Sequence, residues 1–550
     1  MSKLRYIPRV GALLCALAAQ AQTLPHLEKR GQATQLMVDG KPFLMLAGEL
    51  SNTISSDPEA MKAIWPMLAK DLHLNTALTG IAWDWVEPAE GKYDFRYVDD
   101  AIRSARENNL RLVLLWFGSW KNGLSSFAPA WVKADQKRFP RAQIRDGKTI
   151  EVLSAFSEKN QQADARAFAA LLRHVKETDA THRVVMVQVE NEVGILGDAR
   201  DRSAAAERAW AQPVPKELTD YLARHDEDLL PEFRAVWKAA GGQTSGTWPE
   251  VFGTGAKAAE IFQGFQYARY VNAVADAGKR AYALPMYVNA WIVQPQDKEP
   301  GDYPSGGPQS HMHDVWRAGA PRIDLLCPDI YLPDFAGITA QYTRAGNTLF
   351  VPEAAGGAQG AANAFFAIGN HAALGFSPFG IERQRPRTGE ANPLGDAYAM
   401  LGQLAPEILR RQSGGTILAA VLNRAHASQD VELGGYTLHV TLTRSYRTPD
   451  AVPDVTGYGL FLATGGDEFL MAGNHLQISF TPRTAGPKIA SIARQEAGRF
   501  ENGQWVTTRI LGGDDSVLRY DFAKIVETGL SGSGVRLTGN IQKVKLYRYE

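Results

Sequence analysis

The stretch that decides the fold is VVMVQVENEVG, residues 184–194. Five of its first six residues are apolar, which is typical of a strand buried on both faces. The run then ends in Glu190, Asn191 and Glu192. A buried carboxylate costs free energy unless it is paired or hydrogen-bonded, so a buried strand that ends in two of them indicates a functional edge. In parallel α/β barrels, the carboxyl edge of the strands carries the chemistry.

The same order of apolar run, polar loop and helical stretch recurs on both sides of this strand. It predicts strands at residues 43–47, 75–81, 111–117, 184–189, 285–288, 323–326, 348–351 and 374–379. Eight strands that alternate with helices predict an α/β fold, a (β/α)8 TIM barrel at residues 22–400. A tight turn at Asp39-Gly40 forms a hairpin just before the first strand. A doubly wound open sheet is the alternative, and no Gly-rich phosphate loop follows the first strand, which argues against its nucleotide-binding forms.

The pattern changes after the barrel. Short β-rich runs separated by Gly-Gly, Asn-Gly and Asp-Asp turns lie at residues 416–421, 436–442, 458–463, 476–480, 505–510, 517–522 and 541–549. They predict a C-terminal all-β sandwich domain at residues 401–550. Between the fourth and fifth barrel strands, a long excursion occupies about residues 195–256 and contains a charged helix near residues 217–225. Loops of this length are usually functional or disordered.

The N-terminus predicts a signal peptide at residues 1–21. Three basic residues precede a short apolar run at residues 10–18, and Ala19-Gln20-Ala21 is a cleavage pattern. We therefore expect a periplasmic or secreted protein with no membrane attachment after cleavage. The rest of the chain keeps one cysteine, Cys327, so no intrachain disulfide is expected.

The charge balance excludes one class of partner. Lys plus Arg and Asp plus Glu number 59 each, and the mature chain keeps 56 basic against 59 acidic residues, a net charge of −3. This balance gives no sign of a nucleic-acid partner. Whether the chain forms a homodimer stays open at this level.

Polar and aromatic residues gather at the carboxyl ends of the predicted strands. They are Glu49, Glu87, Trp120, Asn191, Glu192, Asn289, Trp291, Tyr331, Glu353 and Glu382. Carboxylates and tryptophans at one rim suit a carbohydrate substrate, because indole faces pack against the apolar faces of sugar rings. No His/Cys/Asp cluster with metal-ligand spacing joins them in the sequence, so we expect no metal and no cofactor.

Hydrolysis of a glycoside needs two carboxylates that flank one bond. In a retaining enzyme they lie about 5 Å apart, one as nucleophile and the other as acid/base. Glu192 and Glu353 are the expected pair, since strands four and seven lie on different sides of a barrel and both side chains can lean across its mouth. Their surroundings must push their pKa values apart, because the nucleophile is ionised and the acid holds a proton.

Residues 187–194 resemble the Q-[IV]-E-N-E-[YF]-G motif of glycoside hydrolase family 35, the β-galactosidases. The resemblance implies that Glu192 is the acid/base and that Asn191 binds the sugar 2-hydroxyl. Glu353, in the sequence Val-Pro-Glu, is similar in position to the family's nucleophile. Further motifs resemble those of the family at Ala47-Gly48-Glu49, at residues 83–88 with 91–95, and at Pro129-Ala130-Trp131.

The chain also departs from that family pattern. Asp84 and Val86 replace an Asn and a His, and Lys121-Asn122-Gly123 stands near the place of an A-E-W segment that supplies a sugar-binding Glu. The chain resembles a divergent bacterial branch of the family, associated with plant cell-wall glycans such as xyloglucan side chains.

The sequence therefore predicts a retaining exo-glycosidase that removes terminal non-reducing β-D-galactosyl residues. Another retaining glycosidase, a β-glucosidase or an arabinosidase, is one alternative, and a catalytically inert glycan-binding protein is the other. The roles of several site residues also have alternatives. Glu49 and Glu87 are sugar ligands or barrel salt bridges, Trp120 and Trp291 are stacking platforms or core residues, and Asn289 and Tyr331 are weaker candidates. Glu382 is a substitute nucleophile, and Glu190 is expected to be a buried, paired structural carboxylate.

Overall fold

The computed structural model describes residues 23–385, 391–444, 451–512, 515 and 534–550. The predicted signal peptide and the strand expected at 517–522 lie outside the described residues. Among the helices that are described, none has the length and apolar character needed to cross a membrane.

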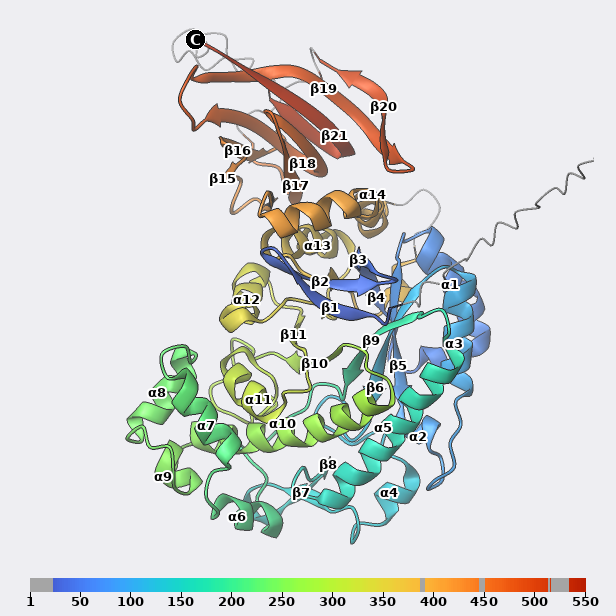
Figure 1. Ribbon diagram of the computed structural model, residues 1–550, viewed down its shortest axis with the longest axis vertical. Coiled ribbons are helices and arrows are strands. Elements are labelled where there is room, and N and C mark those ends of the chain that lie inside the picture. The colour runs from blue at the N-terminus through green and yellow to red at the C-terminus, as the bar shows by residue number, and fades with distance from the viewer. Residues whose placement is uncertain (1–22, 386–390, 445–450, 513–514, 516–533) are drawn as a thin grey trace, which may run out of the picture.

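Eight parallel strands form a nearly closed barrel with helices around it (Figure 1). They are β4 (Met45–Glu49), β5 (Thr76–Ala82), β6 (Arg111–Phe117), β9 (Val184–Val189), β10 (Met286–Trp291), β11 (Leu325–Ile330), β12 (Glu353–Ala354) and β13 (Gly375–Phe376). The strands follow one another around the barrel in chain order, and a bridge between Val351 and Phe376 closes the gap between the β12 and β13 ends. The predicted (β/α)8 barrel is confirmed, and the order is not that of a doubly wound sheet.

The apolar strands form because both of their faces are covered. In β6, Val113 and Leu115 pack in the barrel interior, whereas Leu112 and Leu114 belong to the core under the helices. Every residue of β9 is buried. The alternation of the two faces along a strand thus fills the barrel with side chains, and the site has to lie at the strand ends.

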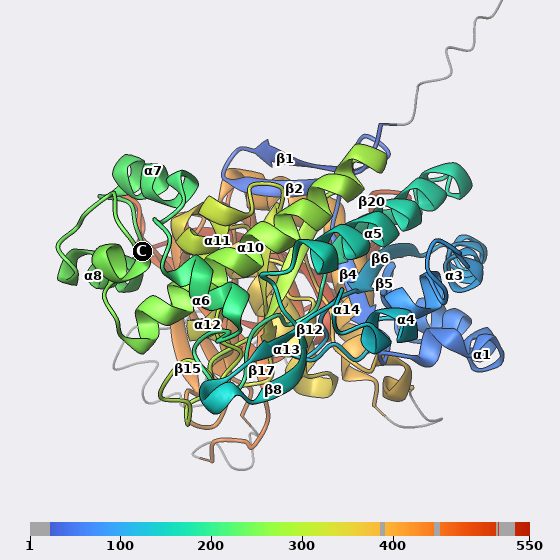
Figure 2. The same cartoon turned by 90° about the horizontal axis from the view of Figure 1, so that it is seen from below.

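The longer helices cover the outside of the barrel. They are α1 (Pro58–Lys70), α3 (Arg96–Glu107), α5 (Glu158–Thr178), α10 (Ala256–Ala281), α11 (His313–Gly319), α12 (Phe335–Tyr342), α13 (Gly357–His371) and α14 (Pro393–Gly414). Helix α5 starts where the Ser157 hydroxyl accepts from the Asn160 amide, a typical N-cap. Helices α5 and α10 pack side by side (Figure 2).

Short elements complete this part of the chain. They are β1 (His26–Arg30), β2 (Ala33–Val38), β3 (Lys41–Phe43), α2 (Trp83–Val86), α4 (Ala130–Ala134), β7 (Arg141–Gln143), β8 (Thr149–Leu153) and the 3-10 turns at 54–56, 145–147, 310–312, 344–346 and 381–384. The predicted hairpin forms between β2 and β3. Its turn residues Asp39 and Gly40 both have positive φ, as a two-residue hairpin turn of this kind requires.

The long excursion is an ordered group of helices. It contains α6 (Ala204–Trp210), α7 (Lys216–His225), α8 (Pro231–Ala239) and α9 (Trp248–Phe252), so the expected charged helix is α7. Phe233, Trp237 and Trp248 are buried in the same core as the barrel helices. These helices lie at the end of the molecule opposite the C-terminal sheet (Figure 1).

The C-terminal part is an antiparallel-sheet domain, as predicted. Its strands are β14 (Ile417–Leu422), β15 (Ser428–Leu433), β16 (Tyr436–Leu442), β17 (Gly457–Gly465), β18 (Glu468–Pro482), β19 (Ile489–Glu501), β20 (Gln504–Leu511) and β21 (Val535–Tyr549). They hydrogen-bond into one branched sheet, in which β18 pairs with β16, β17 and β21. Leu460 and Leu462 join the barrel core beside α13, and Phe461 faces a second core within the domain.

Candidate active site

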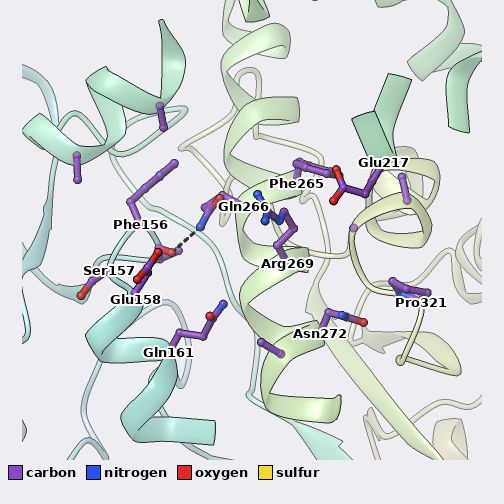
Figure 3. A pocket seen from close by; sticks show the side chains of 16 residues that line it. Phe156, Ser157, Glu158, Gln161, Glu217, Phe265, Gln266, Arg269, Asn272 and Pro321 are labelled. Atoms are coloured by element: carbon purple, nitrogen blue, oxygen red, sulfur yellow. Dashed lines mark hydrogen bonds between the residues drawn. The ribbon is translucent and has the colours of Figure 1, made fainter. Parts of the chain in front are cut away.

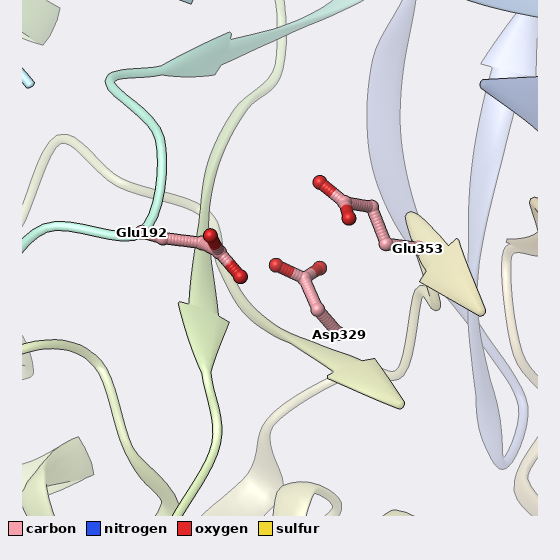
Figure 4. Close-up of side chains that lie close together, drawn as sticks. All are labelled: Glu192, Asp329 and Glu353. Atoms are coloured by element: carbon pink, nitrogen blue, oxygen red, sulfur yellow. The ribbon is translucent and has the colours of Figure 1, made fainter. Parts of the chain in front are cut away.

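Three carboxyl groups from different strands converge at the carboxyl end of the barrel. One oxygen of Glu192, one of Asp329 and one of Glu353 lie within 4.8 Å of one another, and the three side chains point toward a common centre (Figure 4). Asp329 lies in β11 in register with Glu353, the first residue of β12, and Glu192 follows β9 by three residues. All three residues are buried, at 7% exposure or less. The structure thus brings together the two carboxylates that the sequence paired and adds a third.

The end of β9 departs from strand geometry. Glu190 has a φ of 63° and Glu192 a φ of 46°, both in the left-handed region that side chains other than glycine rarely adopt. Each such residue costs roughly 1–2 kcal/mol, which surrounding contacts must offset. The Glu192 carbonyl accepts from the Gly123 amide at 3.1 Å, and its amide donates to Asn289 Oδ1 at 3.0 Å. These contacts hold the turn that aims Glu192 at the cluster.

Glu190 belongs to a separate buried network. Its Oε2 accepts from the Trp120 amide at 2.8 Å, and burial together with Asp164 raises its pKa well above the ordinary value. Asp164 in turn accepts from Trp116 Nε1 at 2.8 Å and from the Ser119 hydroxyl at 2.6 Å. The two glutamates of the motif therefore have different surroundings, and Glu190 supports the strand end.

Glu192 has the environment of a proton donor. Burial, followed by the charge of Glu353, raises its pKa from 4.5 to about 7. Three interactions lower this pKa: the charge of Lys121, the contact with Asp329 and a hydrogen bond from Asn122 Nδ2. A carboxyl group whose pKa lies near neutral pH is well matched to general acid and base catalysis.

Glu353 has one oxygen in a hydrogen bond and one that is open in the sense that it has no hydrogen-bond partner among the residues that the structure describes. The Tyr331 hydroxyl donates to its Oε2 at 3.0 Å, and its Oε1 has no hydrogen-bond partner within the described part of the chain. Burial and the charge of Glu353 raise the pKa of Tyr331, so this phenol stays protonated and remains a donor. An oriented carboxylate with one open oxygen suits a nucleophile.

Asp329 is a site residue that the sequence prediction missed. Its Oδ2 accepts from Asn289 Nδ2 at 2.7 Å, while Asn289 Oδ1 holds the Glu192 amide. Burial, then the charge of Glu353, raises the pKa of Asp329 well above its ordinary range. Asp329 follows the sixth predicted strand by three residues, and its place near that strand end was the available signal.

Lys121 and Asn122 reach the site through a tight turn. The Lys121 amide donates to the Leu124 carbonyl at 2.7 Å, and Asn122 and Gly123 both have positive φ. This is the geometry that an Asn-Gly pair favours in a two-residue hairpin turn, and the dipeptide was the signal for it. Lys121 Nζ donates to Asn191 Oδ1 at 3.0 Å, so this segment supplies a cation next to Asn191.

Several other predicted residues lie at the same rim. Glu49 ends β4 and is fully buried, and neither of its carboxyl oxygens has a hydrogen-bond partner among the residues described. Burial and the charge of Glu353 raise its pKa well above the ordinary value. Asn191 has an Nδ2 without a hydrogen-bond acceptor in the described ranges. Trp291, at the end of β10, is half-buried, so it keeps part of its ring accessible.

Three predicted residues are engaged in contacts outside the carboxyl cluster. Glu87 accepts from Trp83 Nε1 at 2.9 Å and from the Gly91 amide at 2.7 Å, so both of its oxygens hold the chain after α2. The carboxyl group of Glu382 accepts from the amide and hydroxyl of Ser51.

Trp120 is the third of these residues. It has no exposed surface, packs against Tyr267 and Tyr270, and donates from Nε1 to the Leu153 carbonyl at 3.1 Å. The structure places it in the core, one of the two roles that the sequence left open, and its ring offers no face to a sugar.

Glu192, Asp329 and Glu353 also have the spacing of ligands for a metal ion, and their carboxylate oxygens are of the type that hard divalent cations prefer. A bound cation would favour the ionised form of all three. Without a cation, burial and the charge of Glu353 raise the pKa of Glu192 to about 7.

A different hollow, of about 540 Å³, lies on the outer side of the barrel (Figure 3). It is lined by residues at the start of α5 and along α10, among them Ser157, Gln266 and Arg269. Gln266 Nε2 donates to the Ala155 carbonyl at 2.8 Å across it. None of its lining residues belongs to the predicted site, so the candidate active site remains the carboxyl cluster.

Comparisons with known proteins find similarity to β-galactosidases over part of the chain. Residues 58–251 match the model of glycoside hydrolase family 42, described as beta-galactosidase, and residues 394–522 match a domain of unknown function (DUF5597). Family 42 is different from family 35, whose motifs the sequence resembles, so assignment to family 35 is not supported by this match. The matched segment includes Asn191 and Glu192 and ends before Asp329 and Glu353.

Individual proteins are similar to parts of this chain. A beta-galactosidase from Xanthomonas manihotis is 31% identical over 199 residues, which is 35% of this chain and 31% of that protein. Beta-galactosidase structures from Bacillus circulans sp. alkalophilus and Rahnella sp. R3 each show 15% identity and a TM-score of 0.44. The first comparison covers 66% of this chain and 57% of the other, and the second covers 70% and 58%. The chain thus spans about a third of the curated relative and less than three fifths of these structures.

Proposed function

We propose that this protein is a retaining exo-β-galactosidase that removes terminal non-reducing β-D-galactosyl residues. Its substrates are oligosaccharides or plant cell-wall glycans, for example xyloglucan side chains. The observation that carries the proposal is the approach of Glu192 and Glu353 to within 4.8 Å, with the pKa of Glu192 at about 7. This spacing fits retaining hydrolysis, whereas an inverting pair lies roughly 6.5–9.5 Å apart to admit a water molecule. The matched β-galactosidase family model is a second, independent support.

The proposed mechanism has two displacements at the anomeric carbon. Glu353 attacks that carbon, and the bond to the glycosidic oxygen breaks while Glu192 gives this oxygen its proton. The result is a glycosyl ester on Glu353 and a free leaving group. Glu192, now ionised, takes a proton from water, the water oxygen attacks the anomeric carbon, and the ester bond breaks to return Glu353 as a carboxylate. Two inversions release galactose in the β configuration.

Neighbouring residues would hold the sugar in this mechanism. Asn191 offers Nδ2 as a donor to the 2-hydroxyl, and Lys121 fixes its side chain by holding Oδ1. Burial raises the pKa of Glu49, which favours the protonated form that both donates to and accepts from sugar hydroxyls. The mechanism requires no cofactor. The predicted signal peptide supports the further proposal that the reaction takes place in the periplasm or outside the cell.

A panel of nitrophenyl glycosides tests the proposed activity. The purified mature protein should hydrolyse the β-galactoside at least about tenfold faster, in kcat/KM, than the β-glucoside or the α-L-arabinosides, a difference of about 1.4 kcal/mol in transition-state binding. Proton NMR of the first turnovers should show β-galactose before mutarotation. Preference for glucoside or arabinoside would move the specificity to that sugar. No turnover of any glycoside would leave a glycan-binding protein as the function.

The pH dependence of kcat/KM is expected to have an alkaline limb near pH 7. The pKa of Glu192 is raised to about 7, and only the protonated form donates to the leaving oxygen, so activity is present below this pH and falls as pH rises through it. Rates measured at closely spaced pH values with a galactosylated oligosaccharide, whose leaving oxygen needs this proton, give the pKa. A constant rate up to about pH 9 would show that another group is the acid.

Asp329 is expected to act as a positioning residue, and its raised pKa favours the protonated form. Asp329→Asn keeps the shape and a donor toward Glu192, so kcat/KM should fall by less than about tenfold. Asp329→Ala removes the partner of Asn289, which holds the Glu192 turn, and should lower kcat by about 10²-fold. Because the contact with Asp329 lowers the pKa of Glu192, the alanine variant should also shift the alkaline limb upward. Equal losses in both variants, without a pH shift, would contradict this role.

A further inference from the structure

A cavity of about 580 Å³ lies near the carboxyl ends of β10 and β11. It lies between helix α8 of the excursion, the first turns of α10, helix α12 and the loop after β10. Its wall includes Ile292, which follows Trp291 at the end of β10, and Leu332, which follows Tyr331. Tyr331 is the donor to Glu353, and the residue that follows it in the chain, Leu332, lines the cavity. We call it the rim cavity.

Two buried acceptors line the rim cavity. Glu260 is 2% exposed, and its Oε2 accepts from the Tyr303 hydroxyl at 3.1 Å and lies 3.1 Å from His311 Nε2. Gln309 is 1% exposed, and its Nε2 donates to the Pro304 carbonyl at 2.8 Å. The second carboxyl oxygen of Glu260 and the amide oxygen of Gln309, both Oε1, have no hydrogen-bond partner in the ranges that the structure describes. Buried acceptors without donors lose free energy, so both favour a ligand that brings hydroxyl groups.

The rest of the wall is apolar and, at its edge, mainly acidic. The apolar lining residues include Phe233, Val236, Ile292, Pro295, Leu332 and Ile338, which suit the C–H faces of sugar rings. The acidic lining residues are Glu232, Glu260, Asp297, Glu299 and Asp334, whereas the basic ones are Lys257 and Lys298. An acidic excess repels anionic ligands such as uronic acids and phosphates. The volume lies within the range of cavities that bind small molecules.

We infer that the rim cavity binds the neutral oligosaccharide on the leaving-group side of the galactosyl bond. This inference rests on the proposed function, because it assigns a binding place to the part of the substrate beyond the glycosidic bond. In the proposed mechanism, Glu192 and Glu353 flank that bond. It also gives the excursion a role, since α8 supplies one wall of the cavity. Contacts with remote sugar units would raise kcat/KM for a glycan over that for a small aryl galactoside.

Two pairs of tryptophan variants test the rim cavity. Val236→Trp on α8 and Gln341→Trp on α12 place an indole in the cavity from different walls. Ala235→Trp and Ala340→Trp are matched controls, because each lies one residue earlier on the same helix, is exposed and does not line the cavity. Gln341 is exposed, so its variant should fold even if Val236→Trp does not. Thermal melting of all four variants monitors folding.

The first readout is the ratio of kcat/KM for a galactosylated neutral xyloglucan oligosaccharide to that for p-nitrophenyl β-galactoside. We expect this ratio to fall by about tenfold or more in the cavity variants and by less than about twofold in the controls. An unchanged ratio in folded Gln341→Trp would overturn the inference while leaving the proposed function in place.

The second readout is binding of the same oligosaccharide by calorimetry, which needs no turnover. If the wild-type protein hydrolyses neither substrate, the proposed function fails and calorimetry alone decides the rim cavity. Affinity that is about tenfold weaker in Gln341→Trp than in Ala340→Trp supports oligosaccharide binding there. Equal affinity in this pair, or no binding by the wild type, overturns it.

Discussion

Glu353→Gln is expected to lower kcat for β-galactoside hydrolysis by about four orders of magnitude or more, which is the range for removal of an enzymic nucleophile. The amide keeps the size of the side chain and can still accept from Tyr331, so binding and folding should change little. What is lost is the open oxygen Oε1, which in the proposed mechanism bonds to the anomeric carbon. Stopped assays with the nitrophenyl β-galactoside, run at high enzyme concentration, measure the residual rate.

Glu382→Gln is the matched control, because Glu382 is the substitute nucleophile that the sequence left open. Its carboxyl group contacts Ser51, so its replacement should reduce the rate far less. A second arm uses Glu353→Ala with added azide. Azide fills the space of the lost carboxylate and attacks from that side, which gives an α-galactosyl azide by a single inversion. If Glu382→Gln lost its activity and Glu353→Gln kept nearly that of the wild type, Glu382 would be the nucleophile.

The barrel could be predicted because its strands are buried on both faces. Unbroken apolar runs such as β6 have few alternatives, and the predicted bounds 111–117 are those observed. The ends of the later strands were harder to predict from the sequence. The sixth strand was expected at residues 323–326. Proline removes a ladder donor and is rare inside sheets, so the local sequence does not indicate a strand that passes through Pro328. In the structure β11 continues through Pro328 to Ile330.

The extension of β11 explains why the candidate site was predicted only in part. With the strand ending at 326, Asp329 belonged to a loop, and its register with Glu353 could not be anticipated. The pair Glu192 and Glu353 followed from the predicted strands at 184–189 and 348–351, which both residues follow, and from the motif resemblance. The left-handed backbone at Glu190 and Glu192 follows from no local preference of glutamate. It depends on contacts with Gly123 and Asn289 that are distant in sequence.

Glu192→Gln is expected to show an effect that depends on the leaving group. For an oligosaccharide substrate, kcat/KM should fall by about 10²–10⁴-fold, because the leaving oxygen needs a proton as its bond breaks. For a nitrophenyl galactoside the first step should be almost unaffected, since nitrophenolate leaves without protonation. The second step still needs a base, so the glycosyl ester should accumulate and give a burst of nitrophenol. Azide needs no base and should raise the steady-state rate, with β-galactosyl azide as the product.

Two controls separate this effect from a loss of structure. Glu190→Gln lies two residues earlier and should retain most activity, because its carboxyl group contacts Trp120 and Asp164 and not the cluster. Stability gives the second control. Because folding raises the pKa of Glu192 from 4.5 to about 7, the wild type loses stability as pH rises through this interval and stays less stable above it.

The glutamine side chain cannot ionise, so Glu192→Gln should melt at an equal or higher temperature than the wild type at about pH 8. The acid/base carboxyl would then be a group that the fold retains at a cost in stability near neutral pH. A lower melting temperature together with equal rate losses on both substrates would show that Glu192 holds the rim together and does not carry the proton.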